Sequence, residues 1–217
     1  MKGLFITFEG NDGSGKSSAL QAVKQELTDL GYDVLYTREP GGSPIAEKIR
    51  ELILDKANLG MDDKTEALLY AASRREHITK TIIPALDEGK IILCDRFLDS
   101  SLAYQGYARE LGVDNVLNMN QFATEGLFPD LTILVCVHPE IGMSRIKKDE
   151  RDMDRLEIEK MTFHTKVYEG YLKVAEKYNH RIVAINGEQT KEEVLQAVKD
   201  VLYPFIKEHM GWNMKNY

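Results

Sequence analysis

Short apolar runs, rich in β-branched and aromatic residues, recur along the chain and predict five buried strands. The runs are Leu4–Phe8, Asp33–Thr37, Ile91–Asp95, Leu131–Val137 and Arg181–Asn186. None of them alternates cleanly between apolar and polar residues, which is typical of strands covered by helices on both faces. We therefore expect a parallel sheet buried between two layers of helices.

Apolar residues at helical spacing fill most of the chain between these runs. The pattern predicts a helix stopped by Gly31, one over 45–53, one from about Asp63 to Glu88 that Pro84 should kink or break, one before Gly126, and further helices from about Pro139, from about Glu157 to Tyr178, and from Lys191 to Lys207. The repeated order of strand and helix favours one doubly wound α/β sheet. No repeat or linker divides the sequence, so we expect a single domain over residues 1–217.

The composition narrows the possible functions. Hydrophobic residues make up 43% and charged residues 29% of the 217 residues, an ordinary globular balance. The net charge of −7 argues against a long nucleic acid as partner, because such binding needs a dominant positive field. The negative net charge still allows the protein to bind a small anionic ligand.

The sequence also bears on the compartment. No run approaches the roughly 20 apolar residues that span a bilayer, and the N-terminal run is too short for a signal-peptide core. Cys94 and Cys136 each lie in an apolar run, which favours buried free thiols in a reducing compartment over a disulfide or a metal site. We expect a soluble, cytoplasmic protein without a membrane partner.

Residues 10–17 read GNDGSGKS and fit the phosphate-binding motif G-x-x-x-x-G-K-[ST] in full. The motif follows the first predicted strand and opens a helix, the context that separates it from a chance glycine-rich turn. Lys16 should reach the β- and γ-phosphates of a nucleotide, and the Ser17 hydroxyl should bind Mg²⁺. The residues expected to bind ATP here are Gly10, Asn11, Asp12, Gly13, Ser14, Gly15, Lys16, Ser17 and Ser18.

This motif alone leaves GTPase switches, ATPase motors and small-molecule kinases open. A GTPase needs a guanine-reading Asn-Lys-x-Asp run, yet the run Leu131–Val137 continues into His138, Pro139 and Glu140. A motor usually has a strand ending in Asp-Glu, whereas the third run ends in Asp95 followed by Arg96. An arginine in that place favours the binding of a second phosphate group.

Three further motifs lie on what should be the acceptor side. Residues 37–42 read TREPGG, residues 71–77 read AASRREH, and residues 95–106 read DRFLDSSLAYQG. Together with FEG at residues 8–10, they resemble the thymidylate kinase family of the bacterial type, from about Gly3 to Tyr171. The resemblance implies a P-loop kinase fold with a short lid, transfer of phosphate from ATP to dTMP with Mg²⁺ in dTTP biosynthesis, and a homodimer.

The resemblance also implies roles for charged residues at the phosphates. Arg38 and Arg96 match residues that contact phosphates in the active site, and Arg50 matches a further contact to the acceptor phosphate. A planar guanidinium suits this because it binds two phosphate oxygens at once and keeps its charge. Asp95 would help to hold the metal-bound phosphates. The further carboxylates expected near the reacting groups are Asp12 and Glu39, although Glu39 could merely shape the turn before Pro40.

Other residues match groups that recognise the nucleoside. Arg74 matches the residue that bonds a thymine carbonyl, and Gln105 and Ser101 match groups that read the other polar edge of the base. Tyr104 matches the ring beneath the deoxyribose, although it could be ordinary core. Tyr70 stands where relatives commonly have a phenylalanine stacked on thymine. The more ordinary interpretations are kept for Arg75 as a solvated residue, Ser100 as a helix cap, and His77 and His164 as surface or packing residues.

A charged stretch over about residues 145–157 is expected to form the lid. Lids of this family carry a similar Arg-x-x-x-Arg-apolar-Glu pattern, and Gly13 matches the subclass whose basic groups lie in the lid. We expect Arg151 first, and Arg155 with it, to neutralise the transferring phosphate and bind ATP. The alternative is a mobile, solvated charge cluster over Lys147–Asp154.

Two rival functions stay in view. A kinase for another nucleotide should lack the pair Arg74 and Gln105, and a nucleotide-dependent switch without an acceptor should lack Arg38 and Arg96. The sequence has all four residues.

Overall fold

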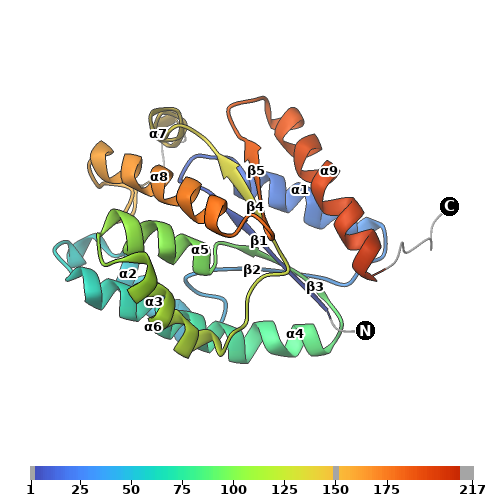
Figure 1. Ribbon diagram of the computed structural model, residues 1–217, viewed down its shortest axis with the longest axis horizontal. Helices are drawn as coiled ribbons and strands as arrows, with labels where there is room; N and C mark the ends of the chain where they lie inside the picture. The colour runs from blue at the N-terminus through green and yellow to red at the C-terminus, as the bar shows by residue number, and fades with distance from the viewer. Residues whose placement is uncertain (1–2, 149–151, 211–217) are drawn as a thin grey trace.

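The computed structural model describes residues 3–148 and 152–210 and contains one five-stranded sheet (Figure 1). The strands are β1 (Leu4–Glu9), β2 (Val34–Arg38), β3 (Ile91–Asp95), β4 (Leu131–Cys136) and β5 (Ile182–Asn186). Their order across the sheet is β2-β3-β1-β4-β5, and every neighbouring pair is parallel. The predicted α/β fold with a five-stranded parallel sheet is confirmed, and the strand ends differ from the expected ones by at most one residue.

Helices connect successive strands. They are α1 (Lys16–Asp29), α2 (Pro44–Leu54), a 3₁₀ turn (Lys56–Asn58), α3 (Asp63–His77), a π-helical turn (Ile78–Ile82), α4 (Ile83–Asp87), α5 (Leu98–Ser101), a π-helical stretch (Leu102–Ala108), α6 (Val113–Thr124), α7 (Pro139–Lys148), α8 (Met161–Lys177) and α9 (Lys191–Met210). None of these helices is long and apolar enough to cross a bilayer.

The strands send apolar side chains to both faces of the sheet. In β1, Leu4 and Ile6 belong to one buried cluster, which α1 and α9 cover, whereas Phe5 belongs to the cluster on the opposite face. The second cluster packs under α4, α6, α8 and the stretch Leu102–Ala108 (Figure 1). Burial on both faces explains why the strands lack a polar alternation in the sequence.

The long helix expected over Asp63–Glu88 has a change of winding within it. An α-helix runs to His77, a π-helical turn follows over Ile78–Ile82, and α4 then has Pro84 as its second residue. The expected disturbance near the proline is therefore present, as a widened turn that precedes it.

No helix was predicted over the stretch Leu98–Ala108, in which Asp99, Ser100, Ser101 and Gly106 have weak helical propensity. It packs closely on α8, where a Cβ added to Gly170 would lie 3.0 Å from the Ala103 carbonyl oxygen. Tertiary contact thus outweighs local preference here.

The helix expected from Glu157 begins later, at Met161. Asp154 accepts hydrogen bonds from the amides of Leu156 and Glu157, both at 2.9 Å, and Glu157 accepts one from the amide of Asp154 at 2.9 Å. These bonds close a turn that keeps residues 154–157 out of the helix.

Candidate active site

A cavity of about 310 Å³ lies where β1, β2 and β3 end. The carboxyl ends of parallel strands are the usual ligand site of such sheets, and the volume is within the range of small-molecule pockets. Of the residues expected from the sequence, it is lined by Asp12, Lys16, Ser17, Arg38, Glu39, Arg50, Tyr70, Arg74, Asp95, Arg96, Tyr104 and Gln105. Residues far apart in the sequence, from both expected substrate ends, therefore face one space.

The glycine-rich loop between β1 and α1 has the backbone of an anion-binding loop. Gly10, Gly13 and Gly15 have φ angles of 141°, 74° and 89°, a region that side chains disfavour. Among the described residues, no side chain caps the N-terminus of α1, and none forms a hydrogen bond with the buried Ser14 hydroxyl. Such a helix start attracts phosphate.

Gly13 also cannot carry a side chain here. A Cβ at this position would lie 2.1 Å from the carbonyl oxygen of Gly142 in α7. Arg145 of the same helix donates a hydrogen bond of 3.3 Å to the Gly13 carbonyl. The close packing of α7 on the loop explains in physical terms why a glycine stands at position 13.

Lys16, Ser17 and Asp95 form a small polar cluster at the end of β3. The Ser17 hydroxyl donates to Asp95 at 2.5 Å, and the Lys16 ammonium lies 3.7 Å from the other Asp95 oxygen. One hydroxyl and one carboxylate are oxygen ligands of the kind that Mg²⁺ takes from proteins, with phosphates and water completing its shell. The donor set thus fits the expected metal.

Arg96 and Asp12 are paired across the cavity floor. Arg96 has a positive φ of 69°, and its Nη2 donates to Asp12 at 2.5 Å, while the Tyr104 hydroxyl donates to the other Asp12 oxygen at 3.0 Å. Burial alone would raise the pKa of Asp12, but the positive charges of Arg96 and Lys16 outweigh it and lower the pKa to about 2. Asp12 therefore stays ionised and holds both Arg96 and Tyr104.

Glu9 lies beneath this pair with no exposed surface. It accepts hydrogen bonds from the amide of Phe97 at 2.7 Å, from Ser100 at 2.5 Å and from the Tyr171 hydroxyl at 3.0 Å. Burial, reinforced by the nearby charge of Asp99, raises its pKa to about 7. Glu9 thus fixes the start of the segment that follows β3.

Two further arginines stand on the wall next to Pro40. Arg38 pairs with Glu47 at 2.9 Å and keeps 41% of its side chain exposed. Arg50 donates to the Pro40 carbonyl at 2.8 Å, and burial together with repulsion from Arg38 lowers its pKa. Cations gathered in this way, with few acceptors of their own, suit an anionic group.

Arg74 is 1% exposed and is held by four hydrogen bonds. Its Nε donates to Glu39 at 2.8 Å, Nη1 donates to Ser101 at 3.1 Å and to Asn120, and Nη2 donates to the Phe97 carbonyl at 2.9 Å. A guanidinium has five N–H donors, so one on Nη2 is left for a ligand.

Glu39 is held from its other side by His77. His77 Nδ1 lies 2.9 Å from Glu39, and Nε2 lies 2.6 Å from the Thr37 hydroxyl. His77 has no exposed surface, which agrees with the packing role expected for it.

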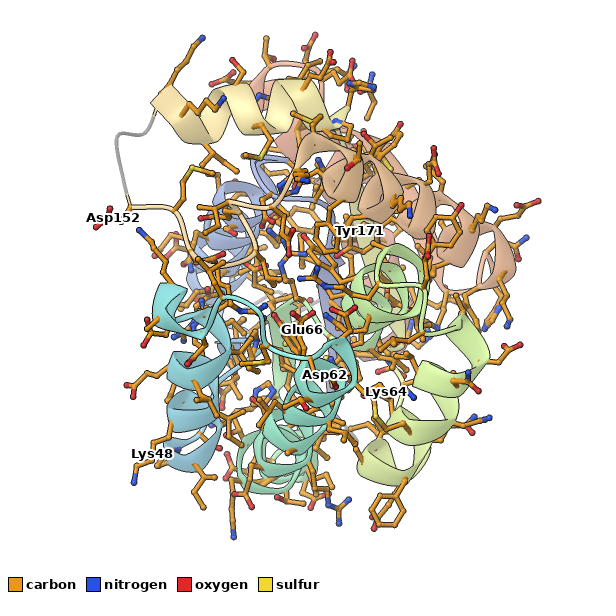
Figure 2. The ribbon with its side chains drawn as sticks, turned by 90° about the vertical axis from the view of Figure 1, so that its left-hand side faces the viewer. Lys48, Asp62, Lys64, Glu66, Asp152 and Tyr171 are labelled. Carbon is orange, nitrogen blue, oxygen red and sulfur yellow. The ribbon has the colours of Figure 1, made fainter. Side chains whose placement is uncertain are left out.

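Glu66 of α3 is a buried carboxylate that contacts Gln105, one of the residues lining the cavity. It accepts hydrogen bonds from Gln105 at 2.8 Å, from Arg155 at 2.6 Å and from Arg109 at 3.3 Å. Figure 2 shows it in the interior of the view, whereas Lys48 and Asp152 point outward at its margin.

Several expected site residues do not line the cavity. Ser101 does not line the cavity but accepts a hydrogen bond from Arg74, which does, so the contact of Ser101 with the base stays a prediction. Arg155 is 3% exposed and is bound to Glu66 and, at 2.6 Å, to the Ile53 carbonyl, so its contact with ATP also stays a prediction. Arg151 lies outside the described residues.

Glu66, Asn120 and Tyr171 contact the site residues but were not singled out from the sequence. Only Glu66 had a usable signal: with Tyr70, Arg74 and His77 it repeats at helical spacing, which puts all four on one face of α3. A carboxylate on a face that otherwise carries site residues indicates a role in the site.

The comparisons with known proteins agree with this geometry. The model of the thymidylate kinase family matches residues 8–198. The chain is similar to the thymidylate kinase of Clostridium novyi (strain NT), with 50% identity over 93% of this chain and 98% of that protein, and to that of Lactobacillus acidophilus, with 55% identity over 91% and 93%.

A solved structure extends the match to the fold. The crystal structure of thymidylate kinase from Ehrlichia chaffeensis superposes with a TM-score of 0.76 and 33% identity, over 94% of this chain and 99% of that one. On its sequence, its fold and the residues that line its cavity, the chain belongs to the thymidylate kinase family.

Proposed function

We propose that this protein transfers the γ-phosphoryl group of ATP to the phosphate of dTMP, giving ADP and dTDP. The observation that carries this assignment is that one cavity is lined by Lys16 and Ser17 of the glycine-rich loop and also by Arg38, Arg50, Arg74, Arg96 and Gln105. Family membership supports the choice of thymidylate as acceptor.

The cationic residues that line the cavity serve to align phosphates and offset their charge. Phosphoryl transfer needs little covalent help from a protein, and the acceptor oxygen is already anionic, so no strong base is required. Lys16 binds the β- and γ-phosphates, and Arg38, Arg50 and Arg96 bind the acceptor and transferring groups. Asp12 stays ionised, since its pKa is about 2, and acts by orienting Arg96.

Mg²⁺ would be held by Ser17 and Asp95, directly or through water, and would supply further positive charge at the phosphates. Ser17 and Asp95 lie close enough to serve one ion, since the Ser17 hydroxyl donates to Asp95 at 2.5 Å.

The part of the cavity lined by Tyr70, Arg74, Tyr104 and Gln105 selects the nucleoside. The remaining N–H of Arg74 donates to a thymine carbonyl, Gln105 reads the neighbouring edge, and the rings of Tyr70 and Tyr104 pack against the base and the sugar. Four hydrogen bonds hold the Arg74 guanidinium in one orientation, which is the preorganisation that such selection needs.

The lid over about residues 145–157 closes over the transferring group and excludes water, with Arg151 as its first cation. Arg155 is bound to Glu66 at 2.6 Å. The protein acts in the cytoplasm, in the supply of dTTP; Cys94 and Cys136 are free thiols, which suits a reducing compartment.

We propose a homodimer formed by the helices α3 and α6, which pack side by side (Figure 1). Leu68 of α3 is 58% exposed and Phe122 of α6 is 90% exposed. Phe122→Asp should shift the protein from dimer to monomer in sedimentation experiments, because an aromatic side chain that the proposed interface would bury is replaced by a charge.

A coupled assay of ADP release tests the main proposal. With ATP and Mg²⁺, dTMP should give the highest kcat/KM among the common deoxy- and ribonucleoside monophosphates. Release of ADP that does not depend on any monophosphate would refute the assignment.

A further inference from the structure

Glu66 is bound by three side chains from two segments of the chain. Its Oε1 accepts from Gln105 Nε2 at 2.8 Å and from Arg109 Nε at 3.4 Å, and its Oε2 accepts from Arg155 Nη2 at 2.6 Å and from Arg109 Nη2 at 3.3 Å. Glu66 has no exposed surface, so water does not compete for these oxygens. The two guanidiniums offset the charge of a carboxylate in the interior.

This arrangement decides which way the Gln105 amide faces. An ionised carboxylate only accepts hydrogen bonds, so Gln105 must turn its NH₂ group toward Glu66. Its carbonyl oxygen, Oε1, is then the group left for the cavity that Gln105 lines. Within residues 3–148 and 152–210 no group donates to this oxygen.

The orientation matters for the choice of base. Next to the carbonyl that receives the N–H of Arg74, thymine carries a ring N–H, which needs an acceptor; cytosine carries a bare ring nitrogen there, which needs a donor. A Gln105 amide held with Oε1 toward the cavity accepts from the first and opposes the second. If the amide turned over, this preference would reverse.

We infer that Glu66 is a specificity-determining positioning residue, which locks the Gln105 amide so that the site takes a base with a ring N–H and rejects one with a ring-nitrogen acceptor. The inference rests on the proposed function, since it concerns how the same site selects its acceptor.

The variant Glu66→Gln tests the lock. Arg155 can only donate and makes the shortest of these bonds, at 2.6 Å, so it takes the carbonyl oxygen of a glutamine at position 66, at the expense of the 3.4 Å bond from Arg109 Nε. The NH₂ group of that glutamine then faces Gln105 and favours the flipped amide. The ratio of kcat/KM for dTMP over 5-methyl-dCMP should fall by about five- to hundredfold, the usual cost of a mismatched buried hydrogen bond.

Because both nucleotides carry the 5-methyl group, the comparison isolates the polar edge of the base. The 4-amino group of 5-methyl-dCMP faces Arg74 equally in both enzymes, so its effect cancels in the change of the ratio.

Arg109→Gln is the matched control. It removes another partner of Glu66 but leaves the carboxylate against Gln105, so the ratio should stay at the wild-type value even if the protein melts earlier. Glu66→Asp, which keeps an acceptor-only group, should retain more of the preference than Glu66→Gln.

If Glu66→Gln does not fold, the double variant Glu66→Gln/Arg109→Gln removes one cation together with the anion and carries the same test, because Arg155 still claims the carbonyl oxygen. A folded variant of either kind that keeps the wild-type ratio overturns the inference. A wild-type protein that does not phosphorylate dTMP overturns the proposed function instead.

Discussion

The two ends of the cavity are built in different ways. The proposed donor end consists of consecutive residues, 10–17, in which Gly10, Gly13 and Gly15 have positive φ angles and Asp12, Lys16 and Ser17 line the cavity. The acceptor end is made of side chains from β2, α2, α3, the segment after β3 and residues 154–157. A local motif is enough for the first, whereas the second exists only once the chain has folded.

The ends also differ in how their charges are stabilised. At the donor end, the ion pair of Lys16 is a long one, to Asp95 at 3.7 Å, which suits the proposed binding of a phosphate by its charge. At the acceptor end, Glu39 with Arg74 and Glu66 with Arg155 are fully buried pairs, at 2.8 and 2.6 Å. Such pairs bring desolvation costs that only complete hydrogen bonding offsets. Damage to the acceptor end should therefore lower stability, and damage to the donor end should lower turnover.

The largest effect is expected for Arg74→Met. It leaves Glu39 buried beside His77 without its guanidinium, and loss of one partner of a buried pair costs about 3–5 kcal/mol of unfolding free energy. Urea denaturation measures this loss. Arg75→Met is the control, because Arg75 and Glu125 are 39% and 68% exposed, and such surface pairs contribute at most about 1 kcal/mol. Equal losses in the two variants would contradict the comparison.

The same contrast explains how much could be predicted from the sequence. The sheet, the order of the elements and the phosphate loop follow from local patterns. The observed ends of the five strands differ from the predicted ends by at most one residue. The arginines of the acceptor end were found through family motifs, not through the periodicity of the chain.

The supporting residues were missed because their partners are distant. Glu66 bonds Gln105, 39 residues away, and Arg155, 89 residues away. The same holds for the helical stretch Leu98–Ala108, whose weak local propensity is overcome by its packing on α8 at Gly170. Helical spacing puts Glu66 on the face of α3 that carries Arg74, but a short window of sequence does not show which distant residues are its partners.

Lys16→Ala breaks the donor end without touching the buried pairs. A charge is lost from a site with little water to replace it, so the loss of transition-state stabilisation should be about 3 kcal/mol or more. Steady-state kinetics measure it, and the preference for dTMP over other monophosphates should persist in the residual activity. A folded variant with near-normal turnover would show that the phosphate loop has been misassigned.

Glu9 lies between the donor and acceptor ends of the cavity, and its ionisation should make the stability of the protein depend on pH. Its pKa is raised from the usual 4.5 to about 7 by burial. The folded state therefore holds this proton more tightly than the unfolded state, and the resulting stabilisation is complete below pH 4.5 and is lost as the pH rises through 7. Between pH 5 and 8 the protein should lose about 2–3 kcal/mol of unfolding free energy from this group.

Urea denaturation of wild type and Glu9→Gln across that range isolates the effect, since a glutamine does not titrate. Asp12 does not interfere, because its pKa of about 2 lies below the window. Stability curves that run parallel for the two proteins would show that Glu9 does not hold a proton in the folded state.

The smallest effect concerns Tyr104, which connects the ends because its hydroxyl donates to Asp12 at 3.0 Å while its ring lies 5.2 Å from the Arg96 guanidinium. A ring packed beneath the sugar excludes a 2′-hydroxyl and offers it no partner. Burying an unpaired hydroxyl costs about 1–3 kcal/mol, so dTMP should exceed its ribose counterpart by roughly tenfold to a hundredfold in kcat/KM.

Three proteins separate a role in sugar selection from ordinary packing: wild type, Tyr104→Phe and Tyr104→Ala. The alanine variant opens room for the 2′-hydroxyl, so the deoxy-to-ribo ratio should shrink even as activity falls. The phenylalanine variant keeps the ring but loses the bond that anchors it to Asp12, so it should lose about 1 kcal/mol of stability and keep most of the ratio. Thermal melts measured beside the kinetics distinguish the two effects, because a residue that only fills the core would change the melting temperature and leave the ratio constant. An alanine variant that melts early yet discriminates as well as wild type would therefore refute the proposed role of the ring.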